Sequence, residues 1–309
     1  MSNILVVGGA GFIGSNLSAL LVKKGHQVVV IDNLSLGIID NLQKIKSSIS
    51  FLQHDYEDKH FLTQTVRDYH VEYIFHFAGL SSAPMFDKRE SEGMAMNVLG
   101  YLNMLEVCRD ENVKRIMYAS TSSIYGDAPV QVEDAKVFPP NFYALTKYTM
   151  EHTARLFNDL YQVESVGFRF FSVYGRNERH KKRYANLISQ FLWAMKEGKD
   201  VVIYGDGNQT RDFIYVLDLC NALITGMEAN GRYAKASVYN VGTSESYTVN
   251  SMVSILEAAL GVKARRKYVS NPVKNYVTHT RADTNKIMND LGFKPSFRLA
   301  EGIQDLISG

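Results

Sequence analysis

The stretch GGAGFIGSNL, residues 8–17, decides the fold, and it follows the apolar run NILVV of residues 3–7 without a break. Its glycines Gly8, Gly11 and Gly14 are spaced as GxxGxxG. Glycine suits a tight turn, a backbone that lies against a phosphate, and a helix packed closely on a strand. A helix that starts at such a turn points its free N–H groups at an anion. The stretch therefore predicts a strand, a phosphate-binding turn and a helix, with a purely structural glycine turn as the alternative.

The next apolar run supplies an acidic residue. VVVID ends in Asp32, close to the ~20-residue separation at which a carboxylate binds the ribose hydroxyls of a dinucleotide. A carboxylate there repels a 2′-phosphate, so the sequence favours NAD over NADP as the cofactor. Asp55, after the third apolar run, either meets the adenine edge or is an ordinary exposed loop residue.

The first half of the chain alternates short apolar runs with helical stretches. The runs are NILVV, QVVVID, ISFLQHD, VEYIFHFAG, KRIMYAS and VESVGFRFF. Such alternation is typical of right-handed βαβ units around a buried parallel sheet. We therefore expect an α/β protein with a doubly wound Rossmann parallel sheet over residues 1–172.

After Phe171 the pattern loosens. We expect helices in ANLISQFLWAMKEG and TVNSMVSILEAALG, a strand in DVVIYG and a final helix in DTNKIMNDLG. These elements predict a smaller C-terminal substrate-binding lobe over residues 173–309, with residues 211–235 returning to the first domain. The lobe should close over the carboxyl ends of the strands, where open α/β sheets bind their ligands.

The composition gives no sign of a special partner. The 309 residues carry a formal net charge of only +2, which points neither to nucleic acid nor to an anionic membrane. Cys108 and Cys220 lack the spacing of a zinc site or a disulfide framework. The first strand begins almost at Met1, which leaves no room for a signal peptide, and no apolar run approaches the ~18 residues of a membrane span. We expect a cytoplasmic protein without a metal site.

Two further motifs contain candidate catalytic residues. YASTSSIYG, residues 118–126, places four hydroxyl residues directly after a strand, which by itself is typical of a turn that caps the next helix. Tyr143 and Lys147 have the YxxxK spacing, which puts both on one face of a helix, one turn apart. Such a pair is either a surface pair or a catalytic one. A neighbouring ammonium stabilises a phenolate and so lets a phenol, with its ordinary pKa of ~10, act as a base.

Together these motifs resemble one family. In chain order they are GGAGFIG, DNLSLG, HFAG, MNVLG, YASTSSIYG, YALTK, FRFFSVYG, YGDGNQTRDFIYV and ADTNKIMNDLG. They span essentially the whole chain. The chain resembles an extended short-chain dehydrogenase/reductase of the NAD-dependent epimerase/dehydratase family. Within that family it resembles the UDP-glucose (UDP-galactose) 4-epimerases. The resemblance implies bound NAD and a nucleotide-sugar substrate, with a UDP-sugar favoured.

The resemblance also implies roles for individual residues. Thr121, Tyr143 and Lys147 would form the catalytic group. The implied cofactor-binding residues are Gly8, Gly11, Phe12, Ile13, Gly14, Asp32, Asn33, Asp55, Tyr56, Phe77, Ala78, Gly79, Asn97, Tyr143 and Lys147. The implied substrate-binding residues are Ser81, Ser122, Ser172, Asn186, Tyr204, Arg211, Lys274 and Arg281. The Arg211 guanidinium suits a diphosphate, with a surface pair to Asp212 as the alternative.

Ser122 and Ser123 stand where dehydratases of this family carry an acidic pair. A serine hydroxyl does not transfer a proton effectively near neutral pH. The resemblance therefore implies hydride transfer alone, in an NAD-dependent epimerisation at C4 that passes through a 4-keto sugar. Tyr143 would be the base, and Thr121 would polarise the 4-oxygen.

Other functions stay open at this point. Ser172 lies in FFSVYG, closer to the FFTVYG of UDP-glucuronate 4-epimerases, so that activity or another nucleotide-sugar epimerisation is the alternative. The family's second phosphate-binding arginine is not evident in NPVKNYV, where Lys274 or Arg281 would replace it. A cofactor-sensing or RNA-binding relative is the non-enzyme alternative, with KARRKY and RHKKR as phosphate contacts.

Two surface features complete the predictions. The basic run RHKKR, residues 179–183, is either a solvated loop or a lid whose cations attract an anionic sugar or diphosphate. The stretches 99–108 and 143–160 carry apolar residues on more than one face. They predict a homodimer through a four-helix interface, with burial inside one subunit as the alternative.

Overall fold

A parallel sheet forms the centre of the protein. The computed structural model describes residues 1–128, 131–233, 235–272 and 276–308. Within these ranges seven strands pair in parallel in the order β11-β6-β5-β4-β1-β2-β3. They are β1 (Asn3–Val7), β2 (Gln27–Ile31), β3 (Ile49–Leu52), β4 (Tyr73–His76), β5 (Arg115–Thr121), β6 (Ser165–Phe170) and β11 (Lys235–Val241). The order reverses between β1 and β4, which is where such sheets open a ligand crevice.

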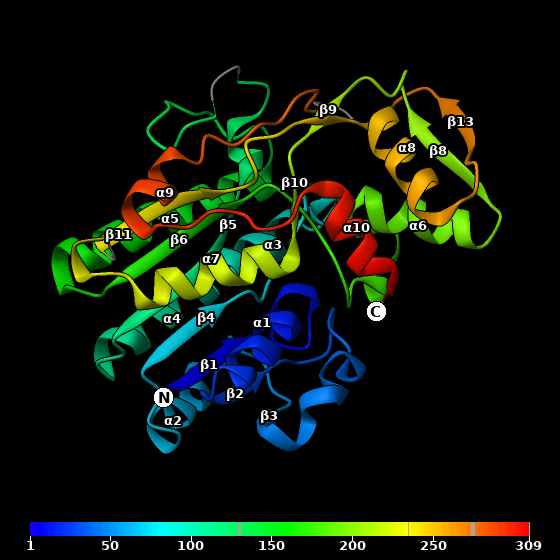
Figure 1. Ribbon diagram of the computed structural model, residues 1–309. Coiled ribbons are helices and arrows are strands. Elements are labelled where there is room, and N and C mark those ends of the chain that lie inside the picture. The colour runs from blue at the N-terminus through cyan, green and yellow to red at the C-terminus, as the bar shows by residue number, and fades with distance from the viewer. Residues whose placement is uncertain (129–130, 234, 273–275, 309) are drawn as a thin grey trace.

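Helices cover both faces of this sheet (Figure 1). They are α1 (Phe12–Lys23), α2 (Lys59–Asp68), α3 (Glu90–Met94), α4 (Gly100–Asp110), α5 (Phe142–Tyr161) and α7 (Val216–Glu228). Ile4 and Val6 of β1 pack in one core with α1 and α7, whereas Leu5 and Val7 pack in a second core with α2, α4 and α5. Because both faces are buried, these strands read as continuous apolar runs. The predicted α/β class with a Rossmann sheet is confirmed.

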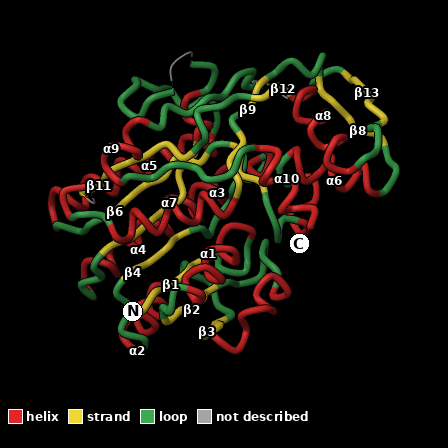
Figure 2. The backbone as a smooth tube through the Cα atoms, viewed as in Figure 1, coloured by secondary structure: helices red, strands yellow, loops and turns green. Residues whose placement is uncertain are grey.

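The smaller lobe lies beyond the carboxyl ends of the strands (Figures 1 and 2). Its elements are α6 (Leu187–Lys196), β8 (Asp200–Tyr204), β9 (Thr210–Arg211), β12 (Tyr247–Thr248), α8 (Val249–Leu260), β13 (Arg265–Val269) and α10 (Leu299–Ser308). The paired strands β7 (Ser172–Tyr174) and β10 (Phe213–Tyr215) connect the lobe to the first domain, and α9 (Asn285–Leu291) packs beside β11 of the central sheet. The expectation that DTNKIMNDLG forms the final helix is wrong, because α10 follows α9. Leu299 and Ile303 of α10 are buried in the core that also contains α7 and α8.

The chain returns to the first domain through β10, α7 and β11. Arg115 of β5 donates to the carbonyls of Gly226 (3.0 Å), Met227 (2.7 Å) and Ala229 (2.9 Å), at the carboxyl end of α7. A cation at this end of a helix satisfies carbonyls that have no partner within the helix. The returning segment extends to Val241, because β11 pairs with β6 along its length.

Candidate active site

A cavity of about 820 Å³ lies at the carboxyl ends of the central strands. Its walls come from the loops after β1, β2, β4 and β5, from α5, and from residues 180–184 of the smaller lobe. Because the carboxyl ends of parallel strands meet at one edge of the sheet, motifs far apart in sequence share this cavity.

The glycine turn after β1 has the shape of a phosphate site. Gly8 has φ +78°, a conformation that L side chains rarely adopt, and a Cβ on Gly14 would collide with the carbonyl oxygen of Gly8. The first turn of α1 therefore lies directly against the turn, and its free N–H groups face the cavity end where Gly11 and Phe12 lie. This cradle fits the pyrophosphate of a dinucleotide.

Asp32 lies at the end of β2 with its carboxylate already held by the backbone. Its two oxygens accept hydrogen bonds from the N–H groups of Ala10 (2.9 Å) and Leu34 (2.8 Å). Burial raises the pKa of Asp32, and these two hydrogen bonds oppose that shift. Asp32 lines the cavity beside Asn33, whose side chain donates to Asp55 at 3.1 Å. Asp32 thus ties the phosphate turn to the loop that follows β2.

Asn97 supports the cavity wall from behind. It is fully buried, accepts from the N–H of Leu80 (2.9 Å) and donates to the carbonyl of Leu80 (3.0 Å) and to Thr146 (3.0 Å). It lies in a π-helical turn, residues 95–99, that joins α3 to α4. These bonds fix the backbone beside Gly79 and join it to α5, one residue from Lys147.

Thr121, Tyr143 and Lys147 all line the cavity and are all buried. Thr121 ends β5 and accepts from the N–H of Ser123 at 3.1 Å, so the hydroxyl-rich turn is capped as expected. Burial raises the pKa of Tyr143, whereas a hydrogen bond with the Thr121 side chain lowers it. Burial also lowers the pKa of Lys147 to about 8. The pKa of Tyr143 is therefore raised in the protein alone, because burial outweighs the stabilisation of its phenolate that was expected from Lys147.

A buried ion pair lies behind the hydroxyl turn. Arg169 of β6 makes a two-pronged contact with Glu151 of α5, at 2.9 and 2.7 Å. Glu151 also accepts from Ser120 at 2.5 Å, and Arg169 donates to the hydroxyl of Tyr125 at 2.8 Å. This network joins both ends of the turn that contains Thr121 to α5 and β6, so it holds Thr121 in place.

The structure brings most of the sequence-predicted residues together. The cavity is lined by Gly8, Gly11, Phe12, Ile13, Gly14, Asp32, Asn33, Tyr56, Phe77, Ala78, Gly79, Ser81, Thr121, Ser122, Tyr143, Lys147 and Ser172. Asn97 lies behind the cavity wall, and Asp55 is joined to the cavity lining through its hydrogen bond with Asn33. All of these residues except Ser172, which begins β7, come from the strands, loops and helices around the central sheet.

Most predicted residues of the smaller lobe lie away from the cavity. Asn186 caps α6 by accepting from the N–H of Ile188 at 3.0 Å, and Tyr204 is exposed at the end of β8. Arg281 donates to the carbonyl of Ser244 at 2.8 Å. Lys274 lies outside the described residues.

Arg211 is held by backbone carbonyls. Its guanidinium donates to Thr210 (2.7 Å), Val277 (2.6 Å) and Thr278 (3.2 Å), and burial lowers its pKa. The alternative of a surface pair with Asp212 is wrong. The Asp212 carboxylate is fully buried and accepts backbone hydrogen bonds from residues 243, 244 and 282.

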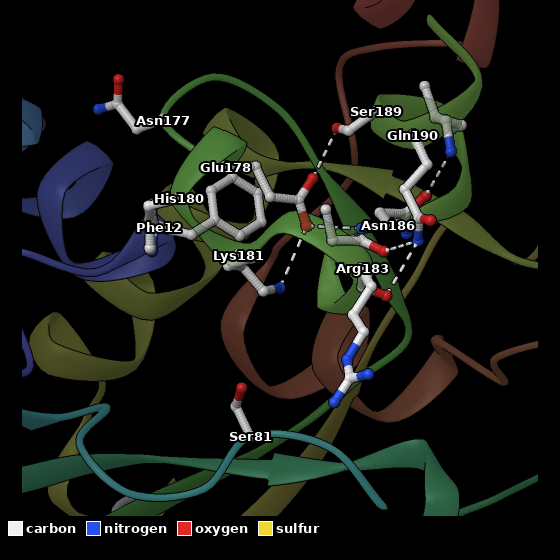
Figure 3. A network of polar contacts seen from close by, with 12 residues as sticks. Phe12, Ser81, Asn177, Glu178, His180, Lys181, Arg183, Asn186, Ser189 and Gln190 are labelled. Atoms are coloured by element: carbon white, nitrogen blue, oxygen red, sulfur yellow. Dashed lines mark hydrogen bonds and ion pairs between the residues drawn. The ribbon is translucent and has the colours of Figure 1, made fainter. Parts of the chain in front are cut away.

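Sequence reasoning missed several lining residues. They are Ser35, Leu36, Gly37, His54, Leu80, Ser82, Ala83, Pro84, Met85, Met96 and Val173. Five of them lie inside the motifs DNLSLG, MNVLG and FRFFSVYG, and five more directly follow HFAG, so position within or just after a motif was the available signal. The basic segment, residues 179–184, also reaches the cavity, and a buried Glu178 anchors it (Figure 3). The signal for that anchor in the sequence was a single acidic residue directly before the basic run.

Within the described ranges, no three His, Cys, Asp or Glu side chains are grouped so as to hold a metal ion. In the same part of the chain, no helix is long and apolar enough to cross a membrane. Cys108 and Cys220 are both buried free thiols.

The parallel sheet, the glycine cradle, Asp32 and the YxxxK pair at one cavity define a short-chain dehydrogenase/reductase of the extended type. The model of the NAD dependent epimerase/dehydratase family matches residues 4–242, and the chain belongs to this family. The predicted dependence on NAD is confirmed with it.

Solved and sequenced relatives agree with this assignment. A UDP-glucose 4-epimerase of Thermotoga maritima, solved with UDP-glucose, has a TM-score of 0.92 and 30% identity, with 99% of this chain and 97% of that chain covered. A UDP-N-acetylglucosamine 4-epimerase of Methanobrevibacter ruminantium, solved with UDP-N-acetylmuramic acid, has the same TM-score, identity and coverage. UDP-glucuronate 4-epimerase 6 of Arabidopsis thaliana is 31% identical over 99% of this chain and 70% of its own length.

Proposed function

We propose that this protein is an NAD-dependent 4-epimerase of a nucleotide sugar, of the UDP-glucose/UDP-galactose type. The observation that supports it best is the set of groups at the reaction end of the cavity. Thr121, Tyr143 and Lys147 lie there with Ser122 and Ser123 beside them, and neither serine serves as an acid for elimination or decarboxylation.

Each of these side chains has a part in the proposed reaction. Tyr143 takes the proton of the 4-hydroxyl and later returns it to the 4-oxygen, while Thr121 donates to that oxygen and orients it. Lys147 favours the phenolate through its charge. When bound, NAD supplies a hydride acceptor and donor for the sugar carbon and a positive ring charge near the phenol. Burial raises the pKa of Tyr143, and both charges would oppose that shift.

The cofactor is assigned to the end of the cavity at the glycine turn. Gly8, Gly11 and Gly14 hold its pyrophosphate, Asp32 binds the adenosine ribose, and Lys147 binds the nicotinamide ribose. The nucleotide-sugar residues proposed from the resemblance are Ser81, Ser122, Ser172, Asn186, Tyr204, Arg211 and Arg281. Asn186, Tyr204, Arg211 and Arg281 lie outside the cavity, so they can contact the substrate only if the smaller lobe moves when substrate binds.

A substrate panel tests the reaction. The NAD-loaded protein is incubated with UDP-, GDP- and ADP-sugars, and the C4 epimers are separated. We expect an equilibrium mixture of one pair of epimers, without loss of water, release of CO₂ or net NADH. A deuterium at C4 should remain in the product, and D₂O should add none at C3 or C5. Solvent deuterium in the ring would contradict the mechanism, and stoichiometric NADH would indicate a dehydrogenase.

Epimerisation of UDP-glucuronate is a second candidate. It is supported by Ser172, which lines the cavity in place of the asparagine of many UDP-hexose epimerases. The same panel distinguishes the two, because UDP-glucuronate would then be converted faster than UDP-glucose. An RNA-binding role is tested by filter binding, for which we expect no saturable retention.

A homodimer is proposed from the surface of α4 and α5. The exposed large apolar side chains there are Leu99, in the turn directly before α4, and Phe142, Leu145, Leu156 and Leu160 of α5. Helix pairs with such faces from two subunits would bury them in one four-helix bundle. Sedimentation should give twice the monomer mass, and Leu156→Glu should give monomers. A cytoplasmic location also stays a prediction.

A further inference from the structure

The basic segment, residues 179–184, contributes most of the cationic surface of the cavity. Among the described residues that line it, the Lys and Arg side chains are Lys147 and three members of this segment, Lys181, Lys182 and Arg183. The lining carboxylate is Asp32, which is already bonded to two backbone N–H groups. This part of the cavity wall therefore carries a positive charge that the glycine turn and Lys147 do not explain.

The segment is built into the lobe and is more than a solvated loop. Glu178, at its start, is 2% exposed. Its carboxylate accepts from Lys181 (3.1 Å), from the N–H of Asn186 (2.7 Å) and from Ser189 (2.6 Å), as Figure 3 shows. A buried carboxylate with three donors is costly to disturb, so it pins both ends of the segment to α6.

Two cations of the segment have partners of their own. The charge of Lys181 is matched by Glu178. Arg179 points out of the cavity, where it pairs with Glu197 at 2.9 Å and lies over the ring of Trp193. Lys182 and Arg183 have no carboxylate partner among the described residues. In the part of the chain that the structure describes, the Arg183 guanidinium donates to the hydroxyl of its neighbour Tyr184, at 2.7 Å.

Arg183 lies at the reaction end of the cavity. Tyr184 packs against a cluster that contains Tyr143, Leu80 and Met85. In Figure 3 the Arg183 guanidinium lies on the side of the view where Ser81 lies and is directed away from Phe12, the first residue of α1 after the glycine turn. The cofactor pyrophosphate, at the turn, is therefore not the anion that Arg183 would meet.

We propose that Arg183, with Lys182 beside it, binds an anionic oxygen group of the nucleotide sugar. A guanidinium can bind a phosphate or a carboxylate through two parallel hydrogen bonds. The group is either the diphosphate, which every nucleotide sugar carries, or a carboxylate on the sugar ring. The inference rests on the proposed function and assigns its substrate an anion contact in the smaller lobe that does not depend on Arg211.

Calorimetric binding to the NAD-loaded protein tests this assignment. UDP-glucose and UDP-glucuronate are titrated into the wild type, Arg183→Gln and Arg179→Gln. Arg179→Gln is a matched control, because it removes the same charge from the same segment outside the cavity. We expect Arg183→Gln to weaken binding about 10-fold and Arg179→Gln to leave it unchanged.

The two substrates distinguish the source of the anion. Loss for both would identify the diphosphate, and loss for UDP-glucuronate alone would identify a ring carboxylate. Unchanged affinity for both in Arg183→Gln would overturn the inference and leave the proposed function intact. Failure of the wild type to bind either sugar would contradict the proposed function and the inference together.

Salt dependence gives a second readout. If Arg183 binds an anion, the affinity of the wild type should fall more steeply with NaCl than that of Arg183→Gln, because one ionic contact is missing from the variant. Lys182→Gln should show the same change to a smaller extent. Identical salt slopes in all three proteins would contradict an ionic role for either residue. The amount of NAD retained should be the same in all of them.

Discussion

The cofactor half of the cavity and its substrate half are built differently. In the first domain, the glycine turn, Asp32 and the YxxxK pair lie within or directly after elements of one sheet, and they line one cavity. In the smaller lobe, Asn186, Tyr204 and Arg211 lie on separate short elements, and none of them lines it. The sheet fixes the position of a motif at a strand end, whereas the position of a residue in the smaller lobe depends on how several short elements pack together.

The largest effect should come from the chemistry of the first domain. Tyr143→Phe removes the proposed base and should lower turnover about 10²- to 10⁴-fold, while NAD stays bound. Tyr148→Phe is the control, because Tyr148 lies on the same helix and packs outside the cavity against His152. Near-wild-type turnover in Tyr143→Phe would remove the tyrosine from the mechanism.

Asp32→Ala should weaken NAD binding by about 10- to 100-fold, the effect of losing a hydrogen bond to a charged group. The variant loses the contact to the ribose and also frees the N–H groups of Ala10 and Leu34. Asp32→Asn keeps the shape and should lose less. Equilibrium titration with NAD measures both variants. Unchanged affinity in Asp32→Ala would make the carboxylate purely structural.

The pH dependence should report Lys147. Burial lowers the pKa of Lys147 to about 8, so its ammonium is present below that pH and is lost as the pH rises through it. Because the cation is the form that favours the phenolate, kcat/KM should fall about tenfold per pH unit on the basic side. A profile that stays flat to pH 10 would mean that the charge of Lys147 is not required.

The smallest effect, and the one that tests the substrate half, is expected for Arg211→Ala. The resemblance assigns its guanidinium to the substrate diphosphate, so KM for the nucleotide sugar should rise about 10-fold with little change in NAD affinity. In the structure the same guanidinium binds the carbonyls of Val277 and Thr278. Equal weakening of both ligands would indicate that Arg211 only holds this segment in place.

Sequence reasoning and structure agree best where a motif is continuous. GGAGFIG predicted the turn and helix of residues 8–23, because glycine spacing and helix propensity act over a few neighbouring residues. The same reasoning took α9 for the last helix, although α10 follows it. The pattern of α10 is amphipathic, but the partner that buries Leu299 and Ile303 comes from distant parts of the chain.

The sequence by itself determined the sheet, the cofactor and the candidate catalytic group. Each is recognised from the spacing of neighbouring residues, and a parallel sheet brings motifs at the ends of its strands to one edge. Only the tertiary structure decided where the basic segment lies and which of its charges have partners. Packing against α6 buries Glu178, matches the charge of Lys181 and leaves Lys182 and Arg183 at the cavity without a carboxylate partner among the described residues. That outcome depends on which charges meet across the fold, and neighbouring residues in the sequence do not specify it.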